Sequence, residues 1–168
     1  MNKVFRIILP IIIVALGIAS CGNNGCDETR ESYCLADLLS TSGAKINQLY
    51  AYGIGQYEMK VGEDTLWVDK EMLSESAPKS LEFILNPDST VTDIRLQMNI
   101  TLDGDQFQFN DTIHFEYTSH PYFLDMECGC SMYFTLKEVT STNNFLRSVT
   151  IKRNEITNEE NINITIEY

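Results

Sequence analysis

Apolar and polar side chains alternate along much of the chain after residue 30, which predicts β-strands. In the stretch 106–118 the odd positions are apolar except for Asp111, and the even positions are polar. A period of two residues places each set on its own face of a strand. The chain ends with a second such pattern, in which Ile162, Ile164, Ile166 and Tyr168 alternate with polar residues. We therefore predict that the C-terminal residues form a strand inside the sheet.

The remaining strands are predicted from apolar runs separated by turn-forming residues. They fall at 45–56, 80–85, 92–102, 131–139 and 145–153, with a short one near 65–68. The turns between strands are predicted at Asn86-Pro87-Asp88, Asp103-Gly104-Asp105, His120-Pro121 and 141–144. The segment 33–39 suits either a strand or a helical turn, and 69–76 is similarly ambiguous. Seven or eight strands at this spacing predict an all-β protein, an antiparallel β-sandwich of immunoglobulin-like or transthyretin-like topology.

The first twenty residues have the features of an export signal. Lys3 and Arg6 precede an apolar run from Ile7 to Ala19. This run is shorter than the roughly 20 apolar residues that span a bilayer, so it predicts a signal peptide rather than a transmembrane helix. The sequence Ile18-Ala19-Ser20-Cys21 resembles the lipobox of bacterial lipoproteins. That resemblance implies that residues 1–20 are removed and that Cys21 carries the lipid.

This anchor fixes the expected organisation and location of the protein. Residues 21–25 are the lipid anchor and a short polar tether, and residues 26–168 form a single β-sandwich domain. Several acyl chains together hold a protein firmly on a membrane. We expect a cell-envelope location, with the outer membrane favoured and both periplasmic and surface-facing orientations open.

The charge of the chain limits its partners. Asp and Glu number 24 against 12 Lys and Arg, which gives a formal net charge of −12. Such a surface disfavours nucleic acid, whose phosphates need cationic partners. The acidic residues are scattered and form no calcium-binding loop of the Asp-x-Asp-x-Asp-Gly type. We therefore expect no metal and no cofactor.

If Cys21 carries lipid, four cysteines remain: Cys26, Cys34, Cys128 and Cys130. An even number of cysteines in an exported chain predicts disulfides, and all three possible pairings stay open. The alternative is a zinc site completed by His114 or His120. The Cys-Gly-Cys spacing is tighter than zinc sites usually show, so we favour disulfides.

The sequence contains no established catalytic motif, and we expect a non-enzymatic binding or structural module. It lacks Gly-x-Ser-x-Gly, His-Glu-x-x-His and a phosphate-binding glycine loop. The alternative is a hydrolytic or glycan-processing accessory enzyme that uses Asp125, Glu127 or His114. Asp125 and Glu127 could serve as paired carboxylates, which are the minimum for glycoside hydrolysis.

Two further patterns concern the envelope. A set of aromatic residues is either core or a stacking platform for sugars, and comprises Tyr50, Tyr52, Trp67, Tyr122, Phe123, Tyr133 and Phe134. Thr65, Ser89 and Thr112 each follow an aspartate in a pattern that resembles a bacterial O-glycosylation acceptor, although the same pairs are common in turns. An envelope protein or glycan is the expected partner.

Several short motifs, together with the lipobox and the early Cys26 and Cys34, resemble a family of uncharacterised Bacteroidota lipoproteins. They are Tyr52-Gly53-Ile54-Gly55-Gln56, Leu85-Asn86-Pro87-Asp88-Ser89, Glu127-Cys128-Gly129-Cys130 and Glu159-Glu160-Asn161. The resemblance implies a membrane-anchored β-domain. The family is a domain of unknown function, so it transfers no catalytic residue to this chain.

Overall fold

The structure is a computed structural model that describes residues 31–61, 64–126 and 128–168. The expected signal peptide (1–20), the anchor and tether (21–25) and Cys26 lie outside the described residues, as does Glu127. Within the described part of the chain, no helix is long and apolar enough to cross a membrane.

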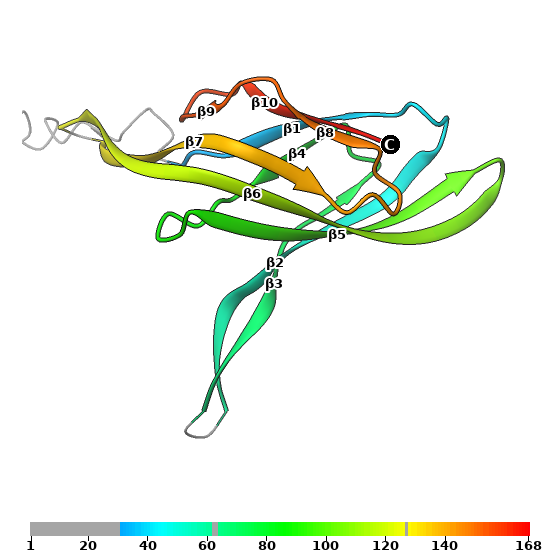
Figure 1. The fold of residues 1–168 in the computed structure, drawn as a ribbon, viewed down its shortest axis with the longest axis horizontal. Helices are drawn as coiled ribbons and strands as arrows, with labels where there is room; N and C mark the ends of the chain where they lie inside the picture. The colour runs from blue at the N-terminus through cyan, green and yellow to red at the C-terminus, as the bar shows by residue number, and fades with distance from the viewer. Residues whose placement is uncertain (1–30, 62–63, 127) are drawn as a thin grey trace, which may run out of the picture.

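The described residues form two sheets packed face to face (Figure 1). One sheet has the order β4-β1-β10-β8 and the other β3-β2-β5-β6-β7-β9. The strands are β1 (Cys34–Leu39), β2 (Lys45–Val61), β3 (Asp64–Ser76), β4 (Ser80–Phe83), β5 (Val91–Leu102), β6 (Asp105–Asp125), β7 (Gly129–Ser141), β8 (Ser148–Ile151), β9 (Glu155–Ile156) and β10 (Ile162–Glu167). All pairs are antiparallel except β1 with β10. The predicted all-β sandwich is confirmed.

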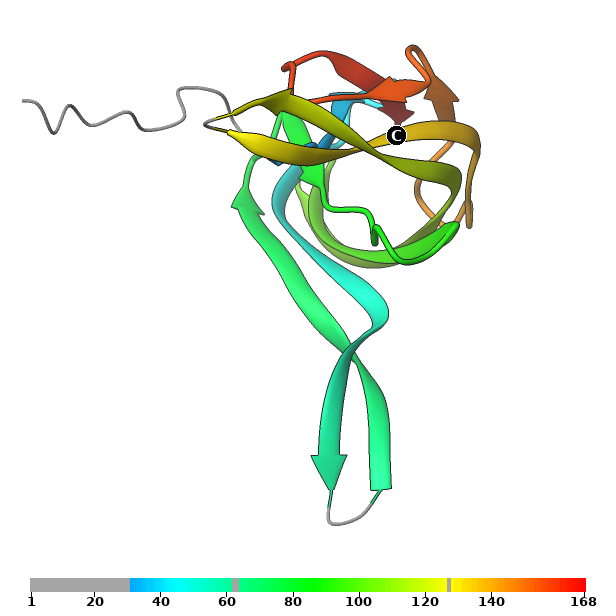
Figure 2. The same cartoon turned by 90° about the vertical axis from the view of Figure 1, so that its left-hand side faces the viewer.

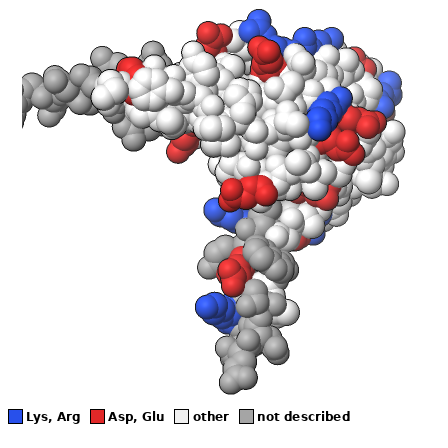
Figure 3. Space-filling view, turned by 60° about the vertical axis from the view of Figure 1, so that its left-hand side comes forward, with Lys and Arg blue, Asp and Glu red and all other residues white. Residues whose placement is uncertain are grey.

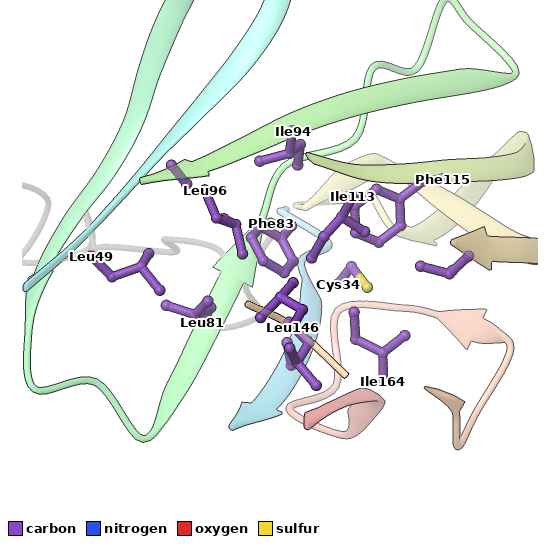
Figure 4. Packing of buried hydrophobic residues seen from close by; sticks show 14 of the residues in the cluster. Cys34, Leu49, Leu81, Phe83, Ile94, Leu96, Ile113, Phe115, Leu146 and Ile164 are labelled. Atoms are coloured by element: carbon purple, nitrogen blue, oxygen red, sulfur yellow. The ribbon is translucent and has the colours of Figure 1, made fainter. Parts of the chain in front are cut away.

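The core lies between the sheets and follows the predicted alternation in β5 and β6. Figure 4 shows Phe83 of β4, Ile94 of β5 and Phe115 of β6 pointing toward one another. The Phe83 and Phe115 ring centroids are 5.6 Å apart. Ile113, Phe115 and Tyr117 are all fully buried, as the odd parity of this strand predicts.

The predicted alternation of buried apolar and exposed polar residues is wrong near the start of β10. Ile162 is exposed, whereas Asn163 is buried. The register of β1 against β10 shifts between Leu35 and Ala36. At this shift the Asn163 side chain accepts a hydrogen bond from the Leu35 N–H (3.0 Å) and donates one to the Glu155 carbonyl (2.8 Å). Asn163 is buried because its amide satisfies backbone groups that the irregular ladder leaves unpaired.

The turn predicted at His120-Pro121 is also wrong, because β6 continues through it to Asp125. Pro121 pairs with Met132 of β7. On its other side β6 is paired with β5 only as far as Glu116. Proline lacks an N–H and suits a strand with one open side, so the strand continues where the sequence indicates a break.

Asp111 is a buried carboxylate that holds the loop between β7 and β8. One carboxylate oxygen accepts hydrogen bonds from the Thr142 hydroxyl (2.9 Å) and the Asn144 N–H (2.8 Å). The other accepts from the N–H groups of Phe145 (2.8 Å) and Leu146 (3.0 Å). Asp111, the polar residue that interrupts the apolar face of β6, therefore holds this loop against the strand through its hydrogen bonds.

The β2–β3 hairpin extends beyond the body as a two-stranded arm (Figures 1 and 2). β2 pairs with β5 only up to Gly53, and its later residues pair with β3 alone. At the root of the arm Arg95 forms a 2.8 Å ion pair with Asp69 and lies 5.1 Å from the centre of the Tyr52 ring. Gly55, at φ +62°, donates its N–H to Asp69 within an irregular register. These contacts fix the direction in which the arm leaves the sheet.

Candidate functional site

The candidate site is a cavity of about 390 Å³ between the β6–β7 hairpin and the segment around β9, where several aromatic rings gather. We call it the aromatic pocket. Its lining residues are His120, Tyr122, Tyr133, Phe134, Thr135, Arg153, Glu155, Ile156, Thr157, Asn158 and Glu159.

The register of β6 against β7 creates the aromatic wall of this pocket. His120 pairs with Tyr133, and Tyr122 follows two residues after His120 on the same strand. Residues opposite each other on antiparallel strands, and residues two apart on one strand, share a face. The Tyr122 and Tyr133 rings stack with centroids 4.5 Å apart and planes 9° apart, and the His120 ring meets Tyr133 edge-on at 6.3 Å.

Two buried apolar residues line the pocket beside the sandwich core. Phe134 and Ile156 are both buried and pair with each other between β7 and β9. The Phe134 ring contacts the buried Tyr117 ring edge-on at a centroid distance of 5.6 Å. The wall is therefore mounted on the sandwich core rather than on a free loop.

Polar groups line the other side of the pocket. The Tyr133 hydroxyl donates a hydrogen bond to the Asn158 side-chain oxygen, which ties the wall to the segment after β9. Arg153, Glu155 and Glu159 are exposed around the opening. One cation and two anions leave this site close to neutral in a chain whose net charge is −12. The arrangement offers flat apolar ring faces beside hydrogen-bonding groups.

Sequence reasoning found part of this site. Of the seven aromatic residues considered, the structure brings together Tyr122, Tyr133 and Phe134, while Phe123 lies outside the pocket. Tyr52 lies instead at the root of the arm, and the side chain of Trp67 lies outside the description. Arg153 and Asn158 were missed because β9 has only two residues and gives no periodic signal.

The residues of the enzymatic alternative are not brought together. His114 and Asp125 are eleven positions apart on the same strand, about 36 Å at the usual rise per residue. The Asp125 carboxylate instead accepts a hydrogen bond from the Cys128 N–H, and Glu127 is outside the described residues. Among the described residues, no three His, Cys, Asp or Glu side chains gather as a metal-binding group.

His114 takes part in a partly exposed cluster of charges with β5. Its Nδ1 lies 2.6 Å from the Asp93 carboxylate, and its Nε2 lies 3.6 Å from that of Glu116. The hydrogen bond with Asp93 is the main cause that raises the pKa of His114 above its ordinary value of 6.5. The imidazolium is therefore favoured by the fold.

We expect NMR titration to give a His114 pKa above 6.5 and the Asp93→Asn variant to return it toward that value. Because the pKa of His114 is raised in the folded state, its interaction with Asp93 adds to the free energy of unfolding. This contribution is fully present below pH 6.5 and is lost as pH rises through the raised pKa. Asp105→Asn is the control, because Asp105 is an exposed residue of β6, the strand that contains His114. An unchanged His114 pKa in Asp93→Asn contradicts this account.

The cysteines differ from the expectation of two disulfides. Cys34 and Cys130 have free thiols, the first fully buried in the core and the second exposed. The two cannot meet because Cys34 faces the space between the sheets, where burial also raises its pKa. Cys128 is buried and disulfide-bonded, and no other described cysteine is its partner.

The three considered O-glycosylation sites lie in different environments. Ser89 is in the turn before β5, where its hydroxyl donates to the Val91 carbonyl at 2.8 Å. Thr112 is within β6 and follows the buried Asp111. Thr65 belongs to β3, and its side chain lies outside the description.

The sequence of this β-sandwich matches the model of a known family. The chain belongs to a family of unknown function, DUF6452, whose model matches residues 59–168. The matched range contains every residue of the aromatic pocket. No curated protein and no solved structure matches the chain.

Proposed function

We propose that the protein is a lipid-anchored module of the cell envelope that binds a neutral saccharide in the aromatic pocket. The observation that carries this proposal is the stacked pair Tyr122 and Tyr133, which stands beside Asn158 and the charged opening of the pocket.

The chemistry of the pocket suits a sugar ring. A pyranose has a face of C–H groups that packs on an aromatic ring, and hydroxyls around its edge that need hydrogen-bond partners. Tyr122, one of the two stacked rings, is 49% exposed and lines the pocket. Arg153 and Glu155 supply a donor and an acceptor at the side. The volume of about 390 Å³ suits a small ligand or one or two sugar units of a longer chain.

The anchoring part of the proposal rests on the sequence before residue 31. The lipobox-like Ile18-Ala19-Ser20-Cys21 supports lipidation at Cys21. The disulfide state of Cys128 supports an oxidising compartment. If Cys21 carries lipid, Cys26 is the cysteine left to pair with Cys128.

In this proposal the protein binds a saccharide and does not catalyse a reaction on it. The separation of His114 from Asp125 supports this choice, as does a pocket built from aromatic rings, an amide and a few charges. Binding sites of this kind orient a ligand through a small number of polar groups.

The test is calorimetric titration of the lipidated protein in phosphatidylcholine nanodiscs. The probes are maltohexaose, cellohexaose, xylohexaose and chitohexaose. At least one is expected to bind, and Tyr122→Ala is expected to weaken that binding about tenfold or more, since about 1.4 kcal/mol corresponds to a factor of ten. Phe107→Ala removes an exposed aromatic outside the pocket and is the matched control. The absence of binding to all four probes, or equal losses in the two variants, overturns the proposal.

A further inference from the structure

We infer that the end of the β6–β7 hairpin, formed by Phe123 and Met126, contacts the lipid surface to which the chain is anchored. This inference rests on the proposed anchoring at Cys21. It adds a second contact with the membrane, made by the folded domain itself.

The first support is the exposure of large apolar side chains at one end of the domain. Phe123 is 56% exposed and Met126 is 91% exposed. Both lie where β6 turns back into β7, the farthest point of this hairpin from its pairing with β5. Single exposed apolar residues are common, but two together at the end of a hairpin match the way small apolar segments enter a membrane interface.

The second support is the place where the described chain begins. The Ser32 hydroxyl is hydrogen-bonded to the Ser131 hydroxyl of β7 at 3.2 Å. Glu31, Ser32 and Tyr33 also line a surface hollow together with Cys130 and Ser131. The N-terminal segment therefore joins the domain at the same end as Phe123, which pairs directly with Cys130.

The third support is the short chain between the lipid and this end. Ten positions separate Cys21 from Glu31, which is about 35 Å at full extension. A disulfide between Cys26 and Cys128 would leave five positions from Cys21 to Cys26, about 18 Å. The anchor thus holds the hairpin end at the membrane, where burial of apolar surface is favourable.

The charged residues near the hairpin end indicate which lipid head group suits the proposed contact. Asp125 and Glu31 are exposed beside it, and on the face shown in Figure 3 acidic and basic side chains are interspersed rather than gathered in one basic patch. Attraction to anionic head groups requires Lys and Arg clusters. The contact is therefore apolar, and zwitterionic phosphatidylcholine is the suitable probe.

The test places a tryptophan at the hairpin end of the full lipidated chain. Phe123→Trp and Met126→Trp are made in a Trp67→Phe background, so that each protein has a single tryptophan. Phe107→Trp is the matched control, because Phe107 is an exposed phenylalanine near the opposite end of β6. Each variant is reconstituted in phosphatidylcholine vesicles with or without lipid brominated on the acyl chains, and circular dichroism checks its fold.

We expect the brominated lipid to quench Phe123→Trp and Met126→Trp at least about twofold more than Phe107→Trp, since interfacial apolar groups lie within about 5–10 Å of the acyl boundary. Equal quenching of all three variants overturns the inference, and Met126→Trp decides if Phe123→Trp does not fold. If no variant floats with the vesicles, the anchoring itself fails. Saccharide binding is measured separately through Tyr122, so each failure is distinguishable.

Discussion

Deletion of residues 162–168 is expected to abolish folding. β10 is an interior strand that pairs with β1 on one side and β8 on the other. Ile164 and Ile166 are fully buried within it. The Tyr168 carbonyl also accepts hydrogen bonds from the Thr41 N–H (2.6 Å) and hydroxyl (2.9 Å). Loss of one buried isoleucine costs about 2–5 kcal/mol, against a total stability of about 5–15 kcal/mol for a typical domain.

Circular dichroism and the dispersion of amide proton shifts measure whether the protein shortened by residues 162–168 folds. Two point variants in β10 show how the loss of stability depends on burial. Ile164→Ala should lower the free energy of unfolding by about 2–5 kcal/mol. Ile162→Ala, on the exposed side of the same strand, should stay within about 0.5 kcal/mol of the parent protein. A shortened chain that still unfolds cooperatively would contradict the central place of β10.

Asp111→Ala is expected to lower the free energy of unfolding by about 3 kcal/mol or more. It removes the acceptor for the Asn144, Phe145 and Leu146 N–H groups at once. A buried donor left without a partner costs about 1–3 kcal/mol. Leu146 is itself part of the core, so the damage extends from the loop into the packing between the sheets.

Urea unfolding of matched variants tests the role of Asp111. Asp105→Ala removes an exposed carboxylate from the same strand and should change the free energy of unfolding by no more than about 0.5 kcal/mol. The expected result is a large difference between the two variants with similar slopes in urea. Equal midpoints would show that the loop does not depend on the Asp111 carboxylate.

The period-two pattern predicted most of the sandwich because burial on one face of a strand leaves a direct trace in the sequence. It located β5, β10 and the first part of β6. It placed Asp111 on the apolar face of β6 but Asn163 on the polar face of β10, and it did not indicate the hydrogen bonds with distant backbone groups that allow both to be buried. In the arm it predicted only the short strand near 65–68, and it did not indicate how far β2 and β3 extend by pairing with each other.

The candidate site was predictable only in its aromatic half. Tyr122 and Tyr133 stood out as residue types, but their stacking depends on the register between β6 and β7. Asn158 and Arg153 enter the pocket through the segment around β9, which no local pattern indicates. The cysteine count suggested two disulfides, yet Cys34 and Cys130 have free thiols, and the core position of Cys34 is not shown by spacing alone.

The parallel pairing of β1 with β10 has a consequence for the order of folding. Leu38 lies beside Ile166, so one of the first described strands is completed by one of the last segments to be synthesised. Contacts between distant segments form slowly, because a long loop must close before they contribute. Until its final residues emerge, β1 has only β4 as a partner in the growing chain, and the four-stranded sheet cannot be completed. We therefore expect the four-stranded sheet to form only after synthesis of the last strand, with β1 paired on one side until then.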